Sequence, residues 1–112
     1  MKFQIGELVR LSAPIANNLL SVVIGAHEGE RDQENCEIVP LTYLQSNQRP
    51  YSATMIEFAE AELGLTFVAE CGLVRSLPAV CLIKDKGGRS LSGANVELIN
   101  AKVKRFLAGD ED

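Results

Sequence analysis

The sequence predicts a mainly β domain that ends in one α-helix. Short apolar runs rich in β-branched residues fill the first 83 residues, turn residues separate them, and helical spacing takes over after residue 92. Such a chain would form a small antiparallel barrel or a strongly bent sheet with the helix packed on it. The 112 residues suit a single domain spanning 1–112, because one domain usually takes about 100–200 residues.

The first strands are expected near the N-terminus. Residues 3–5 and 8–11 predict an early strand, with Gly6 as a bulge or a point of close backbone approach. The near-continuous apolar run at 19–24 predicts a central strand covered on both faces. The almost wholly polar stretch 27–35 is expected to be a solvated loop.

The next strand is predicted over residues 36–44, with Pro40 at a bulge or an edge because proline has no N–H to donate. Residues 51–58 alternate between two faces, which favours a strand followed by a loop. The alternative is a short helix over 57–63 that ends at Gly64.

Two short strands or one kinked strand are predicted over residues 65–69 and 72–75, and Pro78 breaks this pattern. The chain then changes period, with Ser92 as the expected N-cap of a helix and Gly109 as its stop. Asn95 takes the place where a capping box has Glu or Gln, so the cap is incomplete. The apolar residues at helical spacing are Val96, Ile99, Val103, Phe106 and Leu107.

The charge distribution disfavours a general polyanion binder. Eleven basic and fifteen acidic residues give a net charge of −4, whereas nucleic-acid affinity depends on phosphate neutralisation by Lys and Arg. Residues 84–105, however, hold six basic and two acidic side chains, a local net charge of +4. A small polarised surface of this kind can still bind an anion locally.

Several classes of protein are excluded. The longest uncharged apolar run, 19–26, is far shorter than the roughly 20 residues of a membrane-spanning helix, and the N-terminus has no secretory apolar region. The three cysteines have no metal-ligand spacing and suggest reduced, buried thiols in a cytoplasmic protein. No metal or cofactor site is expected. The acidic residues Glu57, Glu60 and Glu62 lack a companion cluster.

Two features could carry chemistry but have plainer readings. His27 is the one histidine, so any Ser-His-Asp catalysis would depend on it, and an exposed loop histidine is the favoured interpretation. Gly87 and Gly88 stand between Lys86 and Arg89 and could cradle a phosphate through backbone N–H groups. A tight turn flanked by solvated charges is the favoured reading.

The order of four short segments resembles that of one protein family. They are Gly6-Glu7-Leu8-Val9, Glu37-Ile38-Val39-Pro40-Leu41-Thr42, Asn47-Gln48-Arg49-Pro50-Tyr51 and the stretch from Phe67 to Ser76. In this order they resemble the MazF/PemK/Kid family of toxin ribonucleases, which shares its fold with CcdB-type toxins. Residues 86–92 and the final helix continue the family's order, so the resemblance covers nearly the whole chain.

The resemblance implies a cytoplasmic homodimer with an SH3-like antiparallel barrel, acting as the toxin of a type II toxin–antitoxin system. Family members cleave single-stranded RNA without a metal by making the 2′-hydroxyl attack the adjacent phosphate. That reaction needs a base, an acid and a cation that stabilises the phosphorane. An antitoxin peptide normally occupies the same groove.

The resemblance also implies site residues. Arg75 would stabilise the phosphate, Thr42 would bond at the scissile group, and Glu70 is the nearby candidate base. Ordinary roles for Thr42 as a strand residue and for Arg75 as a structural cation stay open. The expected RNA-binding residues, which grip the strand by charge and by base stacking, are Arg49, Tyr51 and Ser76.

Departures from the family pattern leave enzymatic activity open. The family's Asp and Gln after its cysteine are Gly72 and Leu73 here, and the arginine before its second strand is missing. A catalytically degenerate barrel that acts as a binding module is therefore the alternative. A third option is CcdB-like binding of DNA gyrase, which uses apolar and aromatic C-terminal residues. The polar ending at residues 109–112 argues against it.

Overall fold

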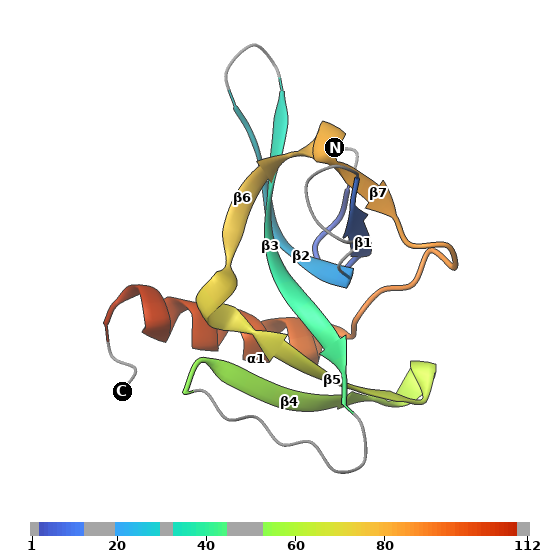
Figure 1. The fold of residues 1–112 in the computed structure, drawn as a ribbon, viewed down its shortest axis with the longest axis vertical. Helices are drawn as coiled ribbons and strands as arrows, with labels where there is room; N and C mark the ends of the chain where they lie inside the picture. The colour runs from blue at the N-terminus through green and yellow to red at the C-terminus, as the bar shows by residue number, and fades with distance from the viewer. Residues whose placement is uncertain (1–2, 13–19, 30–32, 45–52, 110–112) are drawn as a thin grey trace.

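The computed structural model describes residues 3–12, 20–29, 33–44 and 53–109. Within these ranges the chain forms one bent antiparallel sheet of seven strands and one α-helix, α1 (Gly93–Leu107) (Figure 1). The prediction of a mainly β chain that ends in a helix is confirmed. The strands are β1 (Leu8–Leu11), β2 (Leu20–Glu28), β3 (Glu34–Tyr43), β4 (Met55–Glu60), β5 (Leu65–Glu70), β6 (Arg75–Pro78) and β7 (Leu82–Lys84).

Strand β3 changes partners along one of its edges. The sheet order is β4-β5-β3-β2-β1-β7, and β6 pairs with β3 outside this order. On that edge residues 35–38 of β3 pair with β6, and residues 41–43 pair with β5. Pro40 lies in the gap between the two segments, where the absence of a proline N–H suits interrupted pairing. The edge predicted at Pro40 is confirmed.

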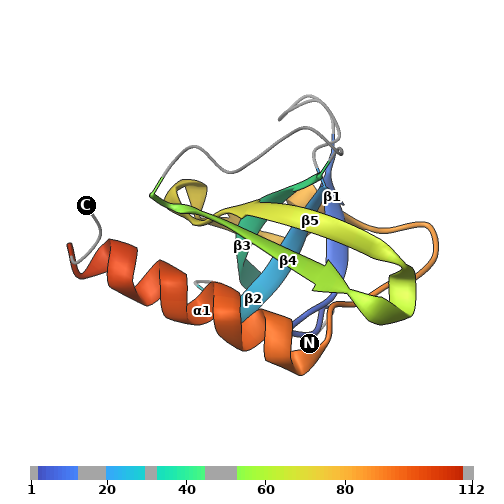
Figure 2. The same cartoon turned by 90° about the horizontal axis from the view of Figure 1, so that it is seen from below.

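The sheet bends strongly but is not closed by hydrogen bonds. Within the described ranges the two end strands of the order, β4 and β7, do not pair with each other. The barrel expected from the resemblance is therefore an open one, in which α1 covers one side of the bent sheet (Figures 1 and 2). The irregular backbone between β5 and β6, along one edge of β3, is where the candidate site lies.

Both faces of the central strands are buried. The first five residues of β2, 20–24, are all buried, which confirms the predicted two-sided strand. Alternate residues contribute to two clusters, one between the sheet and α1 and the other on the opposite face. Cys71 belongs to the first cluster and Cys36 to the second. Burial raises the pKa of the Cys36 thiol, so this cysteine acts as a small apolar core residue.

The N-terminal strand is shorter than predicted. Strand β1 begins at Leu8, and residues 3–5 form no strand. The predicted close approach at Gly6 is confirmed: its N–H donates to the Val23 carbonyl at 2.7 Å, and its carbonyl accepts from Leu91 N–H at 2.8 Å. Gly6 has a φ of +94°, and a Cβ there would meet the Leu91 carbonyl oxygen at 3.3 Å. Glycine therefore permits both the backbone conformation and the contact.

The expected polar loop over residues 27–35 is strand at both of its ends. β2 continues to Glu28 and β3 starts at Glu34, so the two strands form a long hairpin. The prediction of a loop was wrong for residues 27–28 and 34–35 because this end of the hairpin extends beyond the buried clusters, where strand residues can be polar. The ladder also shifts register between Val23 and Gly25, so Ile24 is the extra residue of a β-bulge.

The two readings of residues 51–63 each hold in part. β4 is a strand up to Glu60, and the 3-10 helix η2 (Ala61–Leu63) follows it. Gly64 ends η2 with a φ of +65°, a conformation that glycine adopts without a Cβ penalty. The next segment forms two strands, β5 and β6, as predicted, but the second begins at Arg75 and not at residue 72, because the 3-10 helix η3 (Cys71–Leu73) separates them. Pro78 is the last residue of β6.

The N-terminus of α1 is capped by a residue far away in the sequence. Ser92 is the N-cap as predicted, and its Oγ accepts from Asn95 N–H at 3.4 Å. The backbone N–H of Ser92 donates to Glu60 Oε1 at 2.7 Å, and Asn95 Nδ2 donates to the same oxygen at 3.1 Å. Buried Glu60, on β4, therefore supplies the carboxylate that a capping box normally takes from the third helical residue.

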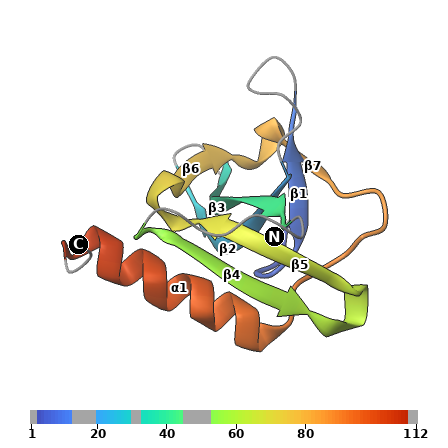
Figure 3. The same cartoon turned by 60° about the horizontal axis from the view of Figure 1, so that its bottom comes forward.

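The apolar face of α1 is buried over most of its length. Val96, Ile99 and Val103 are buried, as their spacing predicts. Leu107 does not follow the prediction, because it is 69% exposed. Figures 2 and 3 show the reason: the C-terminal end of α1 extends past the strands that it packs against.

A buried carboxylate fixes the connection between β7 and α1. Asp85 accepts from Arg89 Nε at 2.6 Å and from Arg89 Nη2 at 3.2 Å. Arg89 Nη2 also donates to the Tyr43 hydroxyl at 3.3 Å, which attaches this connection to the end of β3. The hydrogen bonds from Arg89, helped by the charges of Arg89 and Arg10, hold the pKa of Asp85 below its usual range despite burial.

Replacing Glu60 with Ala is expected to lower the free energy of unfolding by about 1–3 kcal/mol, since two donors at the start of α1 lose their acceptor. Urea unfolding followed by circular dichroism measures the change. Exposed Glu57 on the same strand is the matched control, and Glu57→Ala should shift stability by less than about 0.5 kcal/mol. Equal losses in the two variants would contradict the capping role.

Replacing Asp85 with Asn is expected to destabilise the fold at neutral pH by about 1.5–3 kcal/mol, the range for hydrogen bonds to charged groups. Because the folded pKa of Asp85 is lowered, its contribution is present above the unfolded value of about 3.9 and is lost as the pH falls through the folded value. The stability gap between wild type and variant should therefore shrink in acid. A gap that stays constant between about pH 6 and pH 3 would refute this linkage.

Candidate functional site

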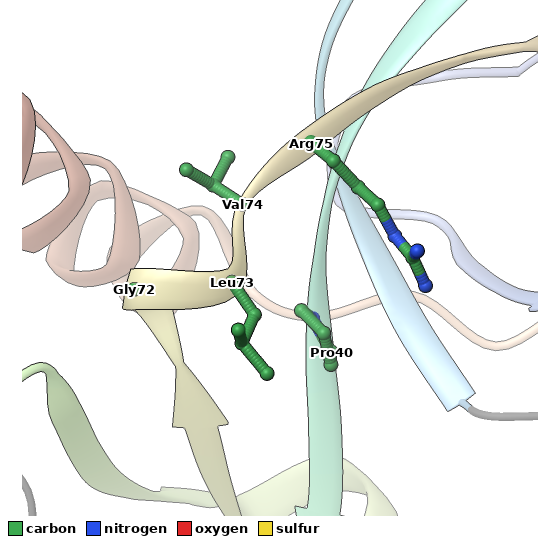
Figure 4. A pocket seen from close by; sticks show the side chains of 5 residues that line it. All are labelled: Pro40, Gly72, Leu73, Val74 and Arg75. Carbon is green, nitrogen blue, oxygen red and sulfur yellow. The ribbon is translucent and has the colours of Figure 1, made fainter.

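The interruption between β5 and β6 forms an open hollow of about 340 Å³. One position of β3 and the segment from η3 to the first residue of β6 line this hollow (Figure 4). The lining residues are Pro40, Gly72, Leu73, Val74 and Arg75.

The side chains around this hollow point in different directions. Figure 4 shows the Arg75 side chain running along β3 beside Pro40, with Leu73 on the other side of Pro40 and Val74 turned away. Arg75 and Leu73 are exposed. Among the described residues, the Arg75 guanidinium has no hydrogen-bond or ion-pair partner, so a cation stands at the rim of the hollow with its charge uncompensated.

The register places Thr42 and Arg75 on the same face of the sheet. Arg75 is paired with Ile38, and paired residues of antiparallel strands project to one face. Alternate residues of β3 share that face, so Pro40 and Thr42 follow Ile38 on it. Thr42 is exposed near the C-terminal end of β3. The Arg75 side chain points toward that end of the strand (Figure 4). Two residues that the resemblance assigns to catalysis thus share one surface.

Glu70 reaches the same face but is held by its neighbours. Thr42 pairs with Val68, and Glu70 lies two residues further along β5, at a diagonal Cβ separation of about 7–8 Å from Thr42. Its Oε1 accepts from Thr54 Oγ1 at 2.5 Å and from Gly72 N–H at 2.8 Å. Oε2 has no hydrogen-bond partner within the described ranges. The carboxylate is therefore fixed through one oxygen.

The glycine that departs from the family pattern is explained by this carboxylate. A Cβ on Gly72 would lie 2.8 Å from Thr54 Oγ1 and 3.0 Å from Glu70 Oε1. An aspartate at position 72 would therefore displace the hydrogen bond between Thr54 and Glu70. Glu70, Thr54 and Gly72 form one local unit, in which Glu70 also acts as the N-cap of η3. The sequence alone indicates Glu70 as a candidate base and Gly72 as an unrelated departure from the pattern.

Ser76 lies on the opposite face from Arg75 and Thr42. It pairs with Glu37, and the two line a second open hollow of about 360 Å³ with His27 and Leu107. Val74 and Arg75 also border this hollow and so form the ridge between the two. The structure therefore does not bring Ser76 to the surface shared by the predicted catalytic residues.

His27 is a strand residue with an acidic neighbour. Its Nδ1 lies 3.8 Å from Glu37 Oε1, and both side chains are about half exposed, at 51% and 48%. The bulge at Ile24 produces this pair: Gly25 then aligns with Glu37, and His27 falls on the same face. The expectation of a loop histidine is corrected. Gly25, which leaves room for the Glu37 carboxylate, is the signal that the sequence contained.

The remaining candidates give no site. Arg49 and Tyr51 lie outside the described residues. Gly88 has a φ of +61°, and its N–H donates to the Asp85 carbonyl at 2.9 Å, so Gly87 and Gly88 form the predicted tight turn. Arg89, which follows this turn, is not solvated as expected, because it binds Asp85 and Tyr43.

The described part of the chain contains no group of three or more His, Cys, Asp or Glu side chains placed to hold a metal ion. None of its helices is long and apolar enough to cross a membrane.

Comparison with known proteins assigns no family. A scan against protein-family models gives no match, and a search of curated proteins finds no significant relative.

Proposed function

We propose that this protein binds single-stranded RNA at the hollow beside Arg75 and cleaves it without a metal, as a cytoplasmic toxin of the MazF/PemK/Kid type. The observation that carries the proposal is the exposed Arg75 guanidinium, which has no ion-pair partner among the described residues, on the face that also presents Thr42 and Glu70. A cation aimed at the developing charge of a phosphorane is the part of this chemistry that contributes most.

The proposed reaction is a transesterification. The RNA 2′-oxygen forms a bond to the adjacent phosphorus, and the bond from phosphorus to the 5′-oxygen breaks, which leaves a 2′,3′-cyclic phosphate and a 5′-hydroxyl. Oε2 of Glu70 accepts the 2′-hydroxyl proton, and the leaving oxygen takes a proton from water. Arg75 neutralises the phosphorane, and the Thr42 hydroxyl donates to a phosphate oxygen.

The partners in this proposal follow from the resemblance. The toxin would form a homodimer, and an antitoxin peptide would cover the hollow and block access of RNA. Leu73, which is 61% exposed at the rim, offers such a peptide an apolar contact beside the charge of Arg75. An exposed leucine next to a cation suits a peptide with both apolar and acidic side chains.

A binding module without catalysis is the second candidate. One observation favours it: Glu70 has a structural role, since its carboxylate joins Thr54 to Gly72 and caps η3. In that case the hollow would bind a peptide or an RNA strand through Arg75 and leave the phosphodiester intact.

Replacing Arg75 with Ala is expected to slow cleavage of a long RNA at least about a hundredfold, because the phosphorane loses its cation. Sequencing of the 5′ ends formed over time measures the rate and the sites. His27→Ala, on the opposite face, is the matched control and should cleave at the wild-type rate. RNA left intact by the wild type would remove the enzyme claim, and a loss confined to His27→Ala would move the reaction to the other hollow.

Replacing Glu70 with Gln tests whether this carboxylate is the base or has only a structural role. The Gln carbonyl can still accept from Thr54 and Gly72, so the urea midpoint should change little, whereas loss of the base should slow cleavage about a hundredfold. Glu57→Gln, an exposed change on the neighbouring strand β4, should leave both measurements unchanged. A Glu70→Gln variant that cleaves like the wild type would show that Glu70 is structural only.

A further inference from the structure

A basic hollow lies beside β7, the last strand in the sheet order. It has a volume of about 450 Å³ and is lined by Arg10 of β1, by Ile83 and Lys84 of β7, and by Lys86 just beyond β7. Figure 1 shows that the three-residue segment η4 (Ala79–Cys81) joins the end of β6 to the start of β7, and that the two strands diverge from this connection. The proposed reaction does not use this hollow.

The cations of this basic hollow stand above buried carboxylates. Lys84 Nζ is 3.7 Å from Glu7 Oε2 and 6.0 Å from the centre of the Phe3 ring. Arg10 Nε is 3.7 Å from Asp85 Oδ1. The side chains of Glu7 and Asp85 are only 11% and 2% exposed, whereas that of Lys84 is 59% exposed. The carboxylates therefore lie beneath the surface, and the positive groups face solvent.

The local charge stays positive after pairing. Four cations and two carboxylates meet here, which gives a net charge of +2 in a chain of net charge −4. Lys86 adds an exposed ammonium at the rim. A positive surface on an acidic protein points to an anionic ligand. The charged groups are Arg10, Lys84, Lys86, Arg89, Glu7 and Asp85.

The sheet connects this basic hollow with the one beside Arg75. Lys84 pairs with Val9, Val9 pairs with Ser21, and Ser21 pairs with Pro40. Residues in one such row project to the same face, so Lys84 and Pro40 are the two ends of a row that crosses four strands, and its middle members Val9 and Ser21 are buried. Three strand spacings of about 4.8 Å place the two ends roughly 14 Å apart.

We infer that the basic hollow binds a second phosphate of the RNA strand whose scissile phosphate lies at Arg75. This inference rests on the proposed function. An extended polyanion of several nucleotides can reach both ends of the row. The ammonium groups of Lys84 and Lys86 would bind phosphate as point charges. A contact of this kind is made to the RNA backbone and does not read the bases. The basic hollow would therefore increase affinity for longer RNA without adding sequence preference.

The test measures how tightly the protein binds a 2′-O-methyl RNA of about ten nucleotides, which cannot undergo 2′-hydroxyl attack. Fluorescence anisotropy at several salt concentrations gives the affinity. Lys86→Glu should weaken binding about tenfold at low salt and make the salt dependence shallower by about one unit of slope. Lys104→Glu changes the net charge equally at an exposed site on α1 and should bind like the wild type. Lys84→Met serves as a second variant that keeps the apolar stem over Phe3.

The outcomes separate this inference from the proposed function. Wild-type binding with equal affinities in the Lys86 and Lys104 variants would overturn the second phosphate site and leave the Arg75 site standing. Absence of RNA binding by the wild type would overturn both. Tight binding of a poly-glutamate peptide that competes with the RNA and is lost in Lys86→Glu would assign the basic hollow to an acidic peptide, against the inference.

Discussion

The candidate site depends on the change of partner along one edge of β3. If β5 continued beside β3 as one strand, this edge of β3 would be paired along its whole length and no hollow would form there. Instead β5 ends at Glu70, η3 turns the chain, and β6 resumes the pairing at Ile38. Pro40 lies at the interruption. The hollow, the exposed Arg75 and the exposed Leu73 are all consequences of this geometry.

A second constraint keeps the interruption in place. The Glu70 carboxylate accepts from Thr54 on one side and from Gly72 on the other, so it ties the start of β4 to η3. Only glycine fits beside it without a clash. In the proposed reaction one carboxylate has two roles. Oε1 of Glu70 orders the turn, and Oε2 would accept the proton.

Much of the fold could be predicted because it follows local periodicity. The spacing of Val96, Ile99 and Val103 identifies α1, and the uninterrupted apolar run at 20–24 identifies β2 as a central strand. Features set by distant contacts could not be predicted. Glu60 caps a helix that begins 33 residues later, and the bulge at Ile24 decides which face His27 occupies. The predicted strand ended at residue 75, so the sequence did not show that Ser76 continues β6 and projects to the face opposite Arg75.

The central claim is that RNA lies on the face of Arg75 and Thr42. The most direct measurement is the set of backbone amide NMR shifts in ¹⁵N-labelled protein titrated with 2′-O-methyl RNA. The account predicts that the largest changes fall at residues 40–42 and 70–75, on the rim of the first hollow. Changes confined to residues 25–28 and 35–37, which surround His27 and Glu37 on the opposite face, would contradict it.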